Sequence, residues 1–161
     1  HTLCLTDEEM RKRGMHPGTI ESHGLFLKGL DNVTRLRGDS RSFEYGKLGR
    51  KFDLIFIDGD HHYDFILGDT KNIFRHLVHE KSIVVWNDYG FHPDQVRYEV
   101  MAAILDGVGP ERAAKVYHVA HTKSVIYTGE KLLSKQADFH AVPEAYFQTE
   151  ISRHPLNESL S

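Results

Sequence analysis

The segment that most constrains the fold covers residues 51–63, where a short apolar run ends abruptly on acids, a glycine and two histidines. The four apolar residues at 54–57 include two β-branched side chains, a pattern typical of a strand buried on both faces of a parallel sheet. Asp58, Gly59 and Asp60 then follow the carboxyl end of the strand, the edge at which open α/β sheets bind ligands. The segment therefore predicts a central strand that delivers polar side chains to a binding site.

A second apolar run, residues 82–86, repeats this design about 30 residues later, which is the spacing of one strand-helix-strand unit. It ends on the sequence Asn-Asp-Tyr-Gly at positions 87–90, so an acid and a glycine again follow a buried strand. Between the two runs, one helical stripe carries Ile66, Thr70, Ile73, Phe74 and Leu77. We therefore expect two neighbouring parallel strands joined by a helix.

The remaining pattern predicts an α/β fold, a Rossmann-like three-layer sandwich with a mostly parallel sheet. Residues 32–37 alternate polar and apolar side chains and predict a further parallel strand nearer the sheet edge. Residues 116–120 and 124–128 are β-rich runs separated by a short turn, which predicts a C-terminal antiparallel hairpin. The sheet is thus expected to be parallel in its middle and antiparallel at one edge.

Further helices are expected in three places. One begins at Thr6, which has Glu9 at the capping-box position. Two short helices are expected within residues 19–30, and another opens at Pro93 and stops at Gly107.

The composition is that of an average soluble protein. The 161 residues are 40% apolar and 27% charged, with a formal charge of −3, and no apolar run is long enough to cross a membrane. Nucleic acid and membrane surfaces are therefore not expected as partners. We expect one domain over residues 1–154, with a short edge strand at 145–151, and a flexible tail over 155–161.

The cysteine and histidine content bears on the cellular compartment of the protein and on metal binding. The single cysteine, Cys4, cannot form an internal disulfide, and no signal peptide precedes it, which favours a cytoplasmic location. The 12 histidines are scattered without a paired metal-ligand spacing such as HExxH. Residues 2–5 are strand-like but follow no polar lead-in, so we interpret the domain as N-terminally incomplete.

These residues resemble the class I S-adenosylmethionine-dependent methyltransferases, and within them the small-molecule branch that carries an Asp-Gly-Asp-His signature after its fourth strand. The resemblance covers residues 2–129 and is strongest at 52–63 and 83–89. It implies a seven-stranded sheet that ends in an antiparallel hairpin, with S-adenosylmethionine as the methyl donor. The first strand of the family and its glycine-rich loop have no counterpart in this sequence. Cys4 stands near the place where the family usually has an acid for the ribose hydroxyls.

The resemblance also implies residues of the cofactor site. Asp39 and Ser40 resemble the acid and its neighbour that lie beside the adenine, and Gly38 before them allows a close approach of the ligand. Asp58 and Gly59 resemble the turn that lines the methyl-donor end of the cofactor. A small-molecule acceptor is expected at the same edge of the sheet.

Polar side chains at the ends of the two central strands offer a metal site. Asp58 ends one strand and Asn87 and Asp88 end the next, so their oxygens are expected to converge about 5 Å apart by strand spacing. Such oxygen ligands suit Mg²⁺ or Ca²⁺, and the arrangement is similar to the magnesium site of catechol O-methyltransferase. The alternative is that these residues cap the following helices as Asx turns.

The catalytic residues expected for O-methylation are Asp58, His61 and Asp88. His61 follows the acids and has an imidazole suited to take the acceptor proton, or a bound metal activates the acceptor instead. The alternative is that His61 or its neighbour merely caps the next helix. Trp86 and Tyr89 are candidates for an aromatic wall of the acceptor pocket, although Trp86 at the end of a buried strand also suits the core.

Two other classes of function stay open. A nicotinamide-dependent oxidoreductase would share the doubly wound sheet, but it requires a G-x-G-x-x-G turn, which is absent from these residues. A non-catalytic cofactor-binding or scaffold protein of the same fold is the other alternative. The sequence names neither the acceptor nor an oligomeric state.

Overall fold

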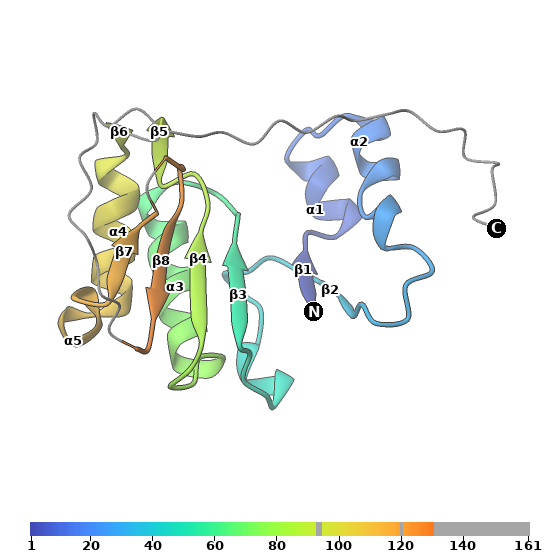
Figure 1. Ribbon diagram of the computed structural model, residues 1–161. Coiled ribbons are helices and arrows are strands. Elements are labelled where there is room, and N and C mark those ends of the chain that lie inside the picture. The colour runs from blue at the N-terminus through green and yellow to red at the C-terminus, as the bar shows by residue number, and fades with distance from the viewer. Residues whose placement is uncertain (93–94, 120, 131–161) are drawn as a thin grey trace, which may run out of the picture.

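The computed structural model describes residues 1–92, 95–119 and 121–130 of the chain. Two groups of elements lie side by side, a small N-terminal group and a larger sheet backed by two helices (Figure 1). No helix in the described ranges is long and apolar enough to span a membrane. The edge strand predicted at 145–151 and the tail predicted at 155–161 lie outside the described residues.

The N-terminal group is built on a pair of parallel strands, β1 (Thr2–Cys4) and β2 (Arg35–Arg37). Between them come α1 (Asp7–Lys12), α2 (Pro17–Ser22) and the 3-10 helix η1 (Leu25–Leu27). The capping box that starts α1 is confirmed, because the Thr6 N–H donates to Glu9 Oε2 (2.6 Å) and the Glu9 N–H donates to Thr6 Oγ1 (3.2 Å). The predicted short helices of this region are therefore present.

The main sheet has the strand order β3-β4-β8-β7. Strand β3 (Leu54–Ile57) is parallel to β4 (Ile83–Trp86), and β4 is antiparallel to β8 (Val125–Thr128). Strand β7 (Val116–His118) completes the hairpin with β8. The predicted parallel pair and the predicted C-terminal hairpin are confirmed.

Two helices, α3 (Tyr63–His76) and α4 (Tyr98–Val108), lie on one face of the main sheet (Figure 1). Val84 of β4 and Ile104 of α4 are completely buried between the layers. Trp86 is buried as well, and its indole N–H donates to Thr70 Oγ1 on α3 (3.1 Å). The expected helix between the two central strands is therefore α3. Shorter helices η2 (Tyr45–Leu48) and α5 (Pro110–Ala113) precede β3 and β7.

The opposite face of the sheet corrects the prediction of a strand buried on both sides. Strand β3 forms the edge of the described sheet, and Leu54 and Phe56 are 65% and 59% exposed. Alternate side chains of a strand point to opposite faces, so Ile55 and Ile57 reach the core while Leu54 and Phe56 do not. The described elements thus form two layers at this sheet, because no described helix covers the second face.

Two further predictions need correction. The strand expected at 32–37 pairs with β1 in a separate sheet and does not join β3 and β4. The helix expected from Pro93 begins only at Tyr98, because β5 (Gly90–His92) and β6 (Gln95–Val96) first form a small antiparallel hairpin. Pro93 itself lies outside the described residues.

Candidate functional site

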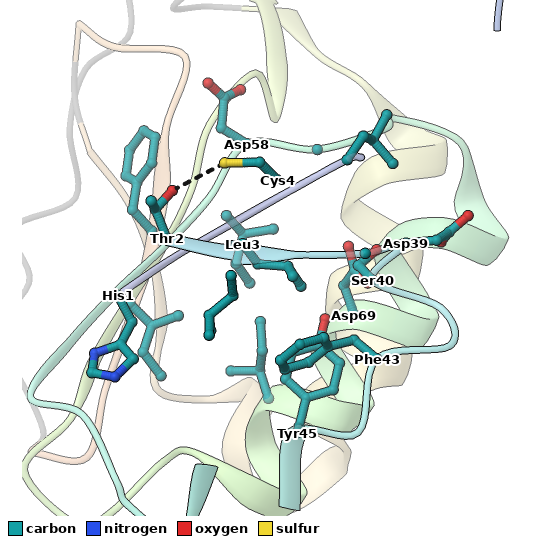
Figure 2. A pocket seen from close by; sticks show the side chains of 18 of the residues that line it. His1, Thr2, Leu3, Cys4, Asp39, Ser40, Phe43, Tyr45, Asp58 and Asp69 are labelled. Carbon is teal, nitrogen blue, oxygen red and sulfur yellow. Dashed lines mark hydrogen bonds between the residues drawn. The ribbon is translucent and has the colours of Figure 1, made fainter. Parts of the chain in front are cut away.

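A cavity of about 880 Å³ lies between the N-terminal sheet and β3 (Figure 2). Many of its apolar residues come from the strands, and its carboxyl groups come from the turns that follow β2 and β3 and from α3. Figure 2 shows Asp58 beside Cys4 in one part of the cavity and Asp39, Ser40 and Asp69 gathered in another. The cavity therefore joins the two turns that the sequence singled out.

The strands on both sides of this cavity have a free edge among the described residues. Of the strands that the structure describes, β1 pairs only with β2, and β3 pairs only with β4. Both strands run upward in Figure 1, and residues of both strands line the cavity. Unpaired backbone N–H and C=O groups at such an edge offer hydrogen bonds to a further strand or to a ligand.

Asp39, which the sequence analysis proposed as a cofactor-site residue, follows β2 and lines the cavity. Its carboxylate accepts hydrogen bonds from the backbone N–H of Arg41 (3.0 Å), from Arg41 Nε (3.0 Å) and from Arg13 Nη2 (3.4 Å). The hydrogen bonds from the Arg41 guanidinium are the largest cause that lowers the pKa of Asp39 to about 2. Asp39 is thus an ionised acid that is already held by two arginines.

Asp69 is a cavity residue that the sequence analysis missed. It lies on the buried face of α3, is 8% exposed, and its Oδ1 has no hydrogen-bond partner in the part of the chain that the structure describes. Burial raises the pKa of Asp69, and a hydrogen bond with Ser40 offsets part of that rise. An acid three residues after Ile66 on the apolar stripe was the signal that could have identified it.

Asp58 and Gly59 form the turn after β3. The side-chain amide of Asn87 donates to Asp58 Oδ1 (3.1 Å), and the backbone N–H of Asn87 donates to the Ile57 carbonyl (2.9 Å). Gly59 lies close to Asp69, because a Cβ at this position would be 3.6 Å from Asp69 Oδ2. The ends of β3 and β4 are therefore tied together at the mouth of the cavity.

His61 and Asp88 join Asp58 in one cluster, whose ligand atoms all lie within 4.8 Å of one another. His61 Nε2 is 3.9 Å from Asp88 Oδ2 and has no hydrogen-bond partner among the described residues. Asp88 has a φ of 51°, in the left-handed region that aspartate tolerates better than most side chains. The structure thus brings together the three residues that the sequence proposed as catalytic.

Lys123 is a second residue that the sequence analysis missed. Its ammonium lies 2.8 Å from Asp88 Oδ1 and is the largest cause that lowers the pKa of Asp88. Lys123 comes from the turn between β7 and β8, 35 positions after Asp88 in a turn that the sequence pattern marked only as a hairpin. No local motif reveals such a contact.

For neighbouring side chains, the structure decides between the alternatives that the sequence left open. His62, not His61, is the N-cap residue of α3, although its side chain makes no capping hydrogen bond and instead contacts Asp60. Trp86 and Tyr89 are both buried in the core. An aromatic wall built from these two side chains is therefore not present.

Comparison with known proteins identifies one family. The sequence model of a family described as "Methyltransferase domain" matches residues 6–89. This range includes Asp39, Asp58, His61 and Asp88 but ends before Lys123. No curated protein and no solved structure matches the chain in the corresponding comparisons.

Proposed function

The chain belongs to the family of methyltransferase domains, and we propose that it transfers a methyl group from S-adenosylmethionine to the oxygen of a small hydroxylated molecule. The match over residues 6–89 covers more than half of the chain, which establishes the family but neither the donor nor the acceptor. The observation that carries the proposal is the single cavity that joins the turn after β2 to the turn after β3.

The chemistry of the cavity fits the proposed cofactor. S-adenosylmethionine supplies a methyl group bound to a positively charged sulfur. The cavity combines apolar strand walls with the carboxyl groups of Asp39, Asp58, Asp60 and Asp69, which suits an amphipathic ligand with positive charge and N–H donors. We assign Asp39 and Ser40 to the adenine end, and Asp58 and Gly59 to the methyl-donor end.

We further infer that one more strand lies between β1 and β3 when the cofactor pocket is complete. Support comes from the two free strand edges that flank the cavity and from the exposed apolar side chains Leu54 and Phe56. The first strand of the resembling family would occupy the part of the cavity that lies between β1 and β3, and the cofactor would lie at the end that is lined by the turns after β2 and β3. The 161-residue chain alone is therefore expected to bind the cofactor weakly.

The cluster of Asp58, His61 and Asp88 is proposed to hold the acceptor oxygen. His61 Nε2 is buried and makes no hydrogen bond within the described residues, so we propose that the acceptor hydroxyl becomes the partner of this nitrogen when the acceptor binds. Asp88 Oδ2, at 3.9 Å, is placed to stabilise the imidazolium that forms when His61 takes the proton. The acceptor oxygen is thereby deprotonated beside the methyl-donor end of the cavity, where in-line attack is geometrically possible.

A magnesium ion on Asp58, Asn87 and Asp88 does not fit the side chains as they stand. Asn87 turns its amide N–H₂ toward Asp58, so its oxygen points elsewhere, and Lys123 already contacts Asp88. Mg²⁺ requires oxygen ligands in near-octahedral geometry. The proposed mechanism therefore has no step that depends on a metal.

Calorimetric titration with S-adenosylmethionine, S-adenosylhomocysteine and NAD⁺ tests the proposal. The experiment uses the 161-residue chain and the same chain joined to the family's first strand and glycine-rich loop. Binding of the two adenosyl ligands but not of NAD⁺, followed by transfer of a labelled methyl group to a phenol or alcohol, is the expected result. Preference for NAD⁺ would favour an oxidoreductase, and binding without transfer to any acceptor would favour a non-catalytic binding protein.

A further inference from the structure

The turn between β7 and β8 is held over the end of β4. Strand β8 runs antiparallel to β4 with Val125 opposite Trp86, so the turn that precedes β8 lies at the edge where β4 ends. Within the turn, Thr122 Oγ1 donates to the Val119 carbonyl (2.8 Å) and accepts from the Ser124 N–H (3.1 Å). The topology and these bonds place Lys123 beside the residues that follow β4.

Lys123 forms an ion pair with Asp88, a carboxylate that a metal in the cluster would require as a ligand. Its Nζ lies 2.8 Å from Asp88 Oδ1, while the other oxygen of Asp88 faces His61 at 3.9 Å. Asp58, the remaining acid of the cluster, accepts a hydrogen bond from Asn87. Both carboxylates therefore already accept hydrogen bonds from nitrogen donors of the chain itself.

An ammonium in this position excludes a divalent cation by two effects. A metal bound to Asp88 would stand within a few ångströms of the Lys123 charge and be repelled by it. Displacing Lys123 would also break a charge-assisted hydrogen bond. The ammonium keeps two further N–H donors that Asp88 Oδ1 does not use, and the lysine side chain is half exposed.

We propose that the Lys123 ammonium takes the place of a divalent metal in this site, where it neutralises Asp88 and donates a hydrogen bond to the acceptor oxygen. An acceptor with an acidic hydroxyl, such as a phenol, suits this arrangement, because its oxygen becomes negative when its proton passes to His61 Nε2. The identity of the acceptor rests on the proposed function. The exclusion of metal rests only on the geometry of the cluster.

Titration with Mn²⁺ alone tests the exclusion of metal, with free Mn²⁺ followed by electron paramagnetic resonance. The wild-type chain is expected to bind Mn²⁺ weakly, and Lys123→Met at least 10-fold more tightly, because the Asp88 carboxylate is released from the ammonium and the charge that repels the metal is removed. Lys123→Arg keeps the charge and should remain weak. Lys71→Met, which removes an exposed lysine of α3, is the matched control and should equal wild type.

A double variant connects any new metal affinity to this cluster. Lys123→Met combined with Asp88→Asn should return to the weak affinity of wild type, and circular dichroism should show that all variants are folded. Equal Mn²⁺ affinity in wild type and Lys123→Met, whether tight or weak, would overturn the proposal, as would a gain that survives Asp88→Asn. The titration needs no methyl donor and no acceptor, so its failure is distinguishable from a failure of the proposed methyl transfer.

Discussion

The two halves of the described chain differ in how they are held together. From Tyr45 onward, α3, α4 and the main sheet share one core of buried side chains. Among the side chains described before Tyr45, only Met10 and Ile20 are buried, and neither belongs to that core. The proposed chemistry lies in the well-packed half and Asp39 lies in the loosely packed half, so the comparison predicts that catalysis and cofactor binding can be separated by mutation.

The largest expected effect is on the rate of methyl transfer. His61→Ala should lower kcat by about 10²–10⁴-fold, the usual contribution of a general base, while leaving the affinity for S-adenosylhomocysteine within a factor of two or so. EDTA should have little effect on either quantity. His79→Ala, which removes a histidine paired with Asp53 at the opposite end of the sheet, is the control. An equal loss in cofactor affinity would show that the two functions are not separable in this way.

The second-largest effect is expected on the free energy of unfolding, where one substitution in each half allows a direct comparison. Ile104→Ala should lower the free energy of unfolding by about 2–5 kcal/mol, because Ile104 is completely buried in the core. Ile20→Ala should lower the free energy of unfolding less, by below about 2 kcal/mol, because Ile20 does not belong to the main core. Urea denaturation followed by circular dichroism measures both. Equal losses would mean that the N-terminal half is as firmly packed as the main sheet.

A smaller effect is expected on cofactor binding. Asp39→Ala should weaken the binding of S-adenosylhomocysteine by about 1–3 kcal/mol if the carboxylate accepts a hydrogen bond from the ligand. Isothermal titration calorimetry measures this change, and kcat at saturating cofactor should stay near that of wild type. Unchanged affinity would remove Asp39 from the site. Asp7→Ala, which breaks the ion pair between Asp7 and Arg37 in the same half of the chain, is the control.

The smallest effect is a dependence of stability on acid pH. The pKa of Asp39 is lowered from 3.8 to about 2, chiefly by the Arg41 guanidinium, so the ion pair stabilises the folded state above the unfolded pKa. This contribution is lost as the pH falls from about 4 through the folded pKa of about 2. Because Arg41 is half exposed, the loss should be about 1 kcal/mol, and it should be absent in Asp39→Asn. Unfolding of both proteins between pH 5 and pH 2 measures the difference, and identical curves would contradict it.

Local patterns predicted the elements of the well-packed half. The apolar runs at 54–57 and 82–86 and the stripe between them became β3, β4 and α3, because each pattern matches the period of its own element. The turns after these strands meet because parallel strands end at the same edge of a sheet. Asp58, His61 and Asp88 were therefore predictable as neighbours.

Contacts between distant segments were not predictable in the same way. The pattern of β3 indicated burial on both faces, but the described elements cover only one, so Leu54 and Phe56 are exposed. Lys123 meets Asp88 only through the antiparallel pairing of β8 with β4. The apolar stripe of α3 indicates the burial of Asp69, but the contact of Asp69 with Ser40 depends on where the loop after β2 packs, which no periodicity encodes. In each case the sequence pattern predicted the helix or strand but not the residues that pack against it.

The most direct test of the account is hydrogen exchange of the chain joined to the family's first strand and glycine-rich loop, measured by mass spectrometry with and without saturating S-adenosylhomocysteine. If the cofactor lies in the cavity, the ligand should slow exchange in residues 38–41 and 57–60 together, because both turns line it. NAD⁺ at the same concentration should protect neither segment. Protection of only one turn, or protection confined to the other face of the main sheet, would contradict the placement of the cofactor between the two halves.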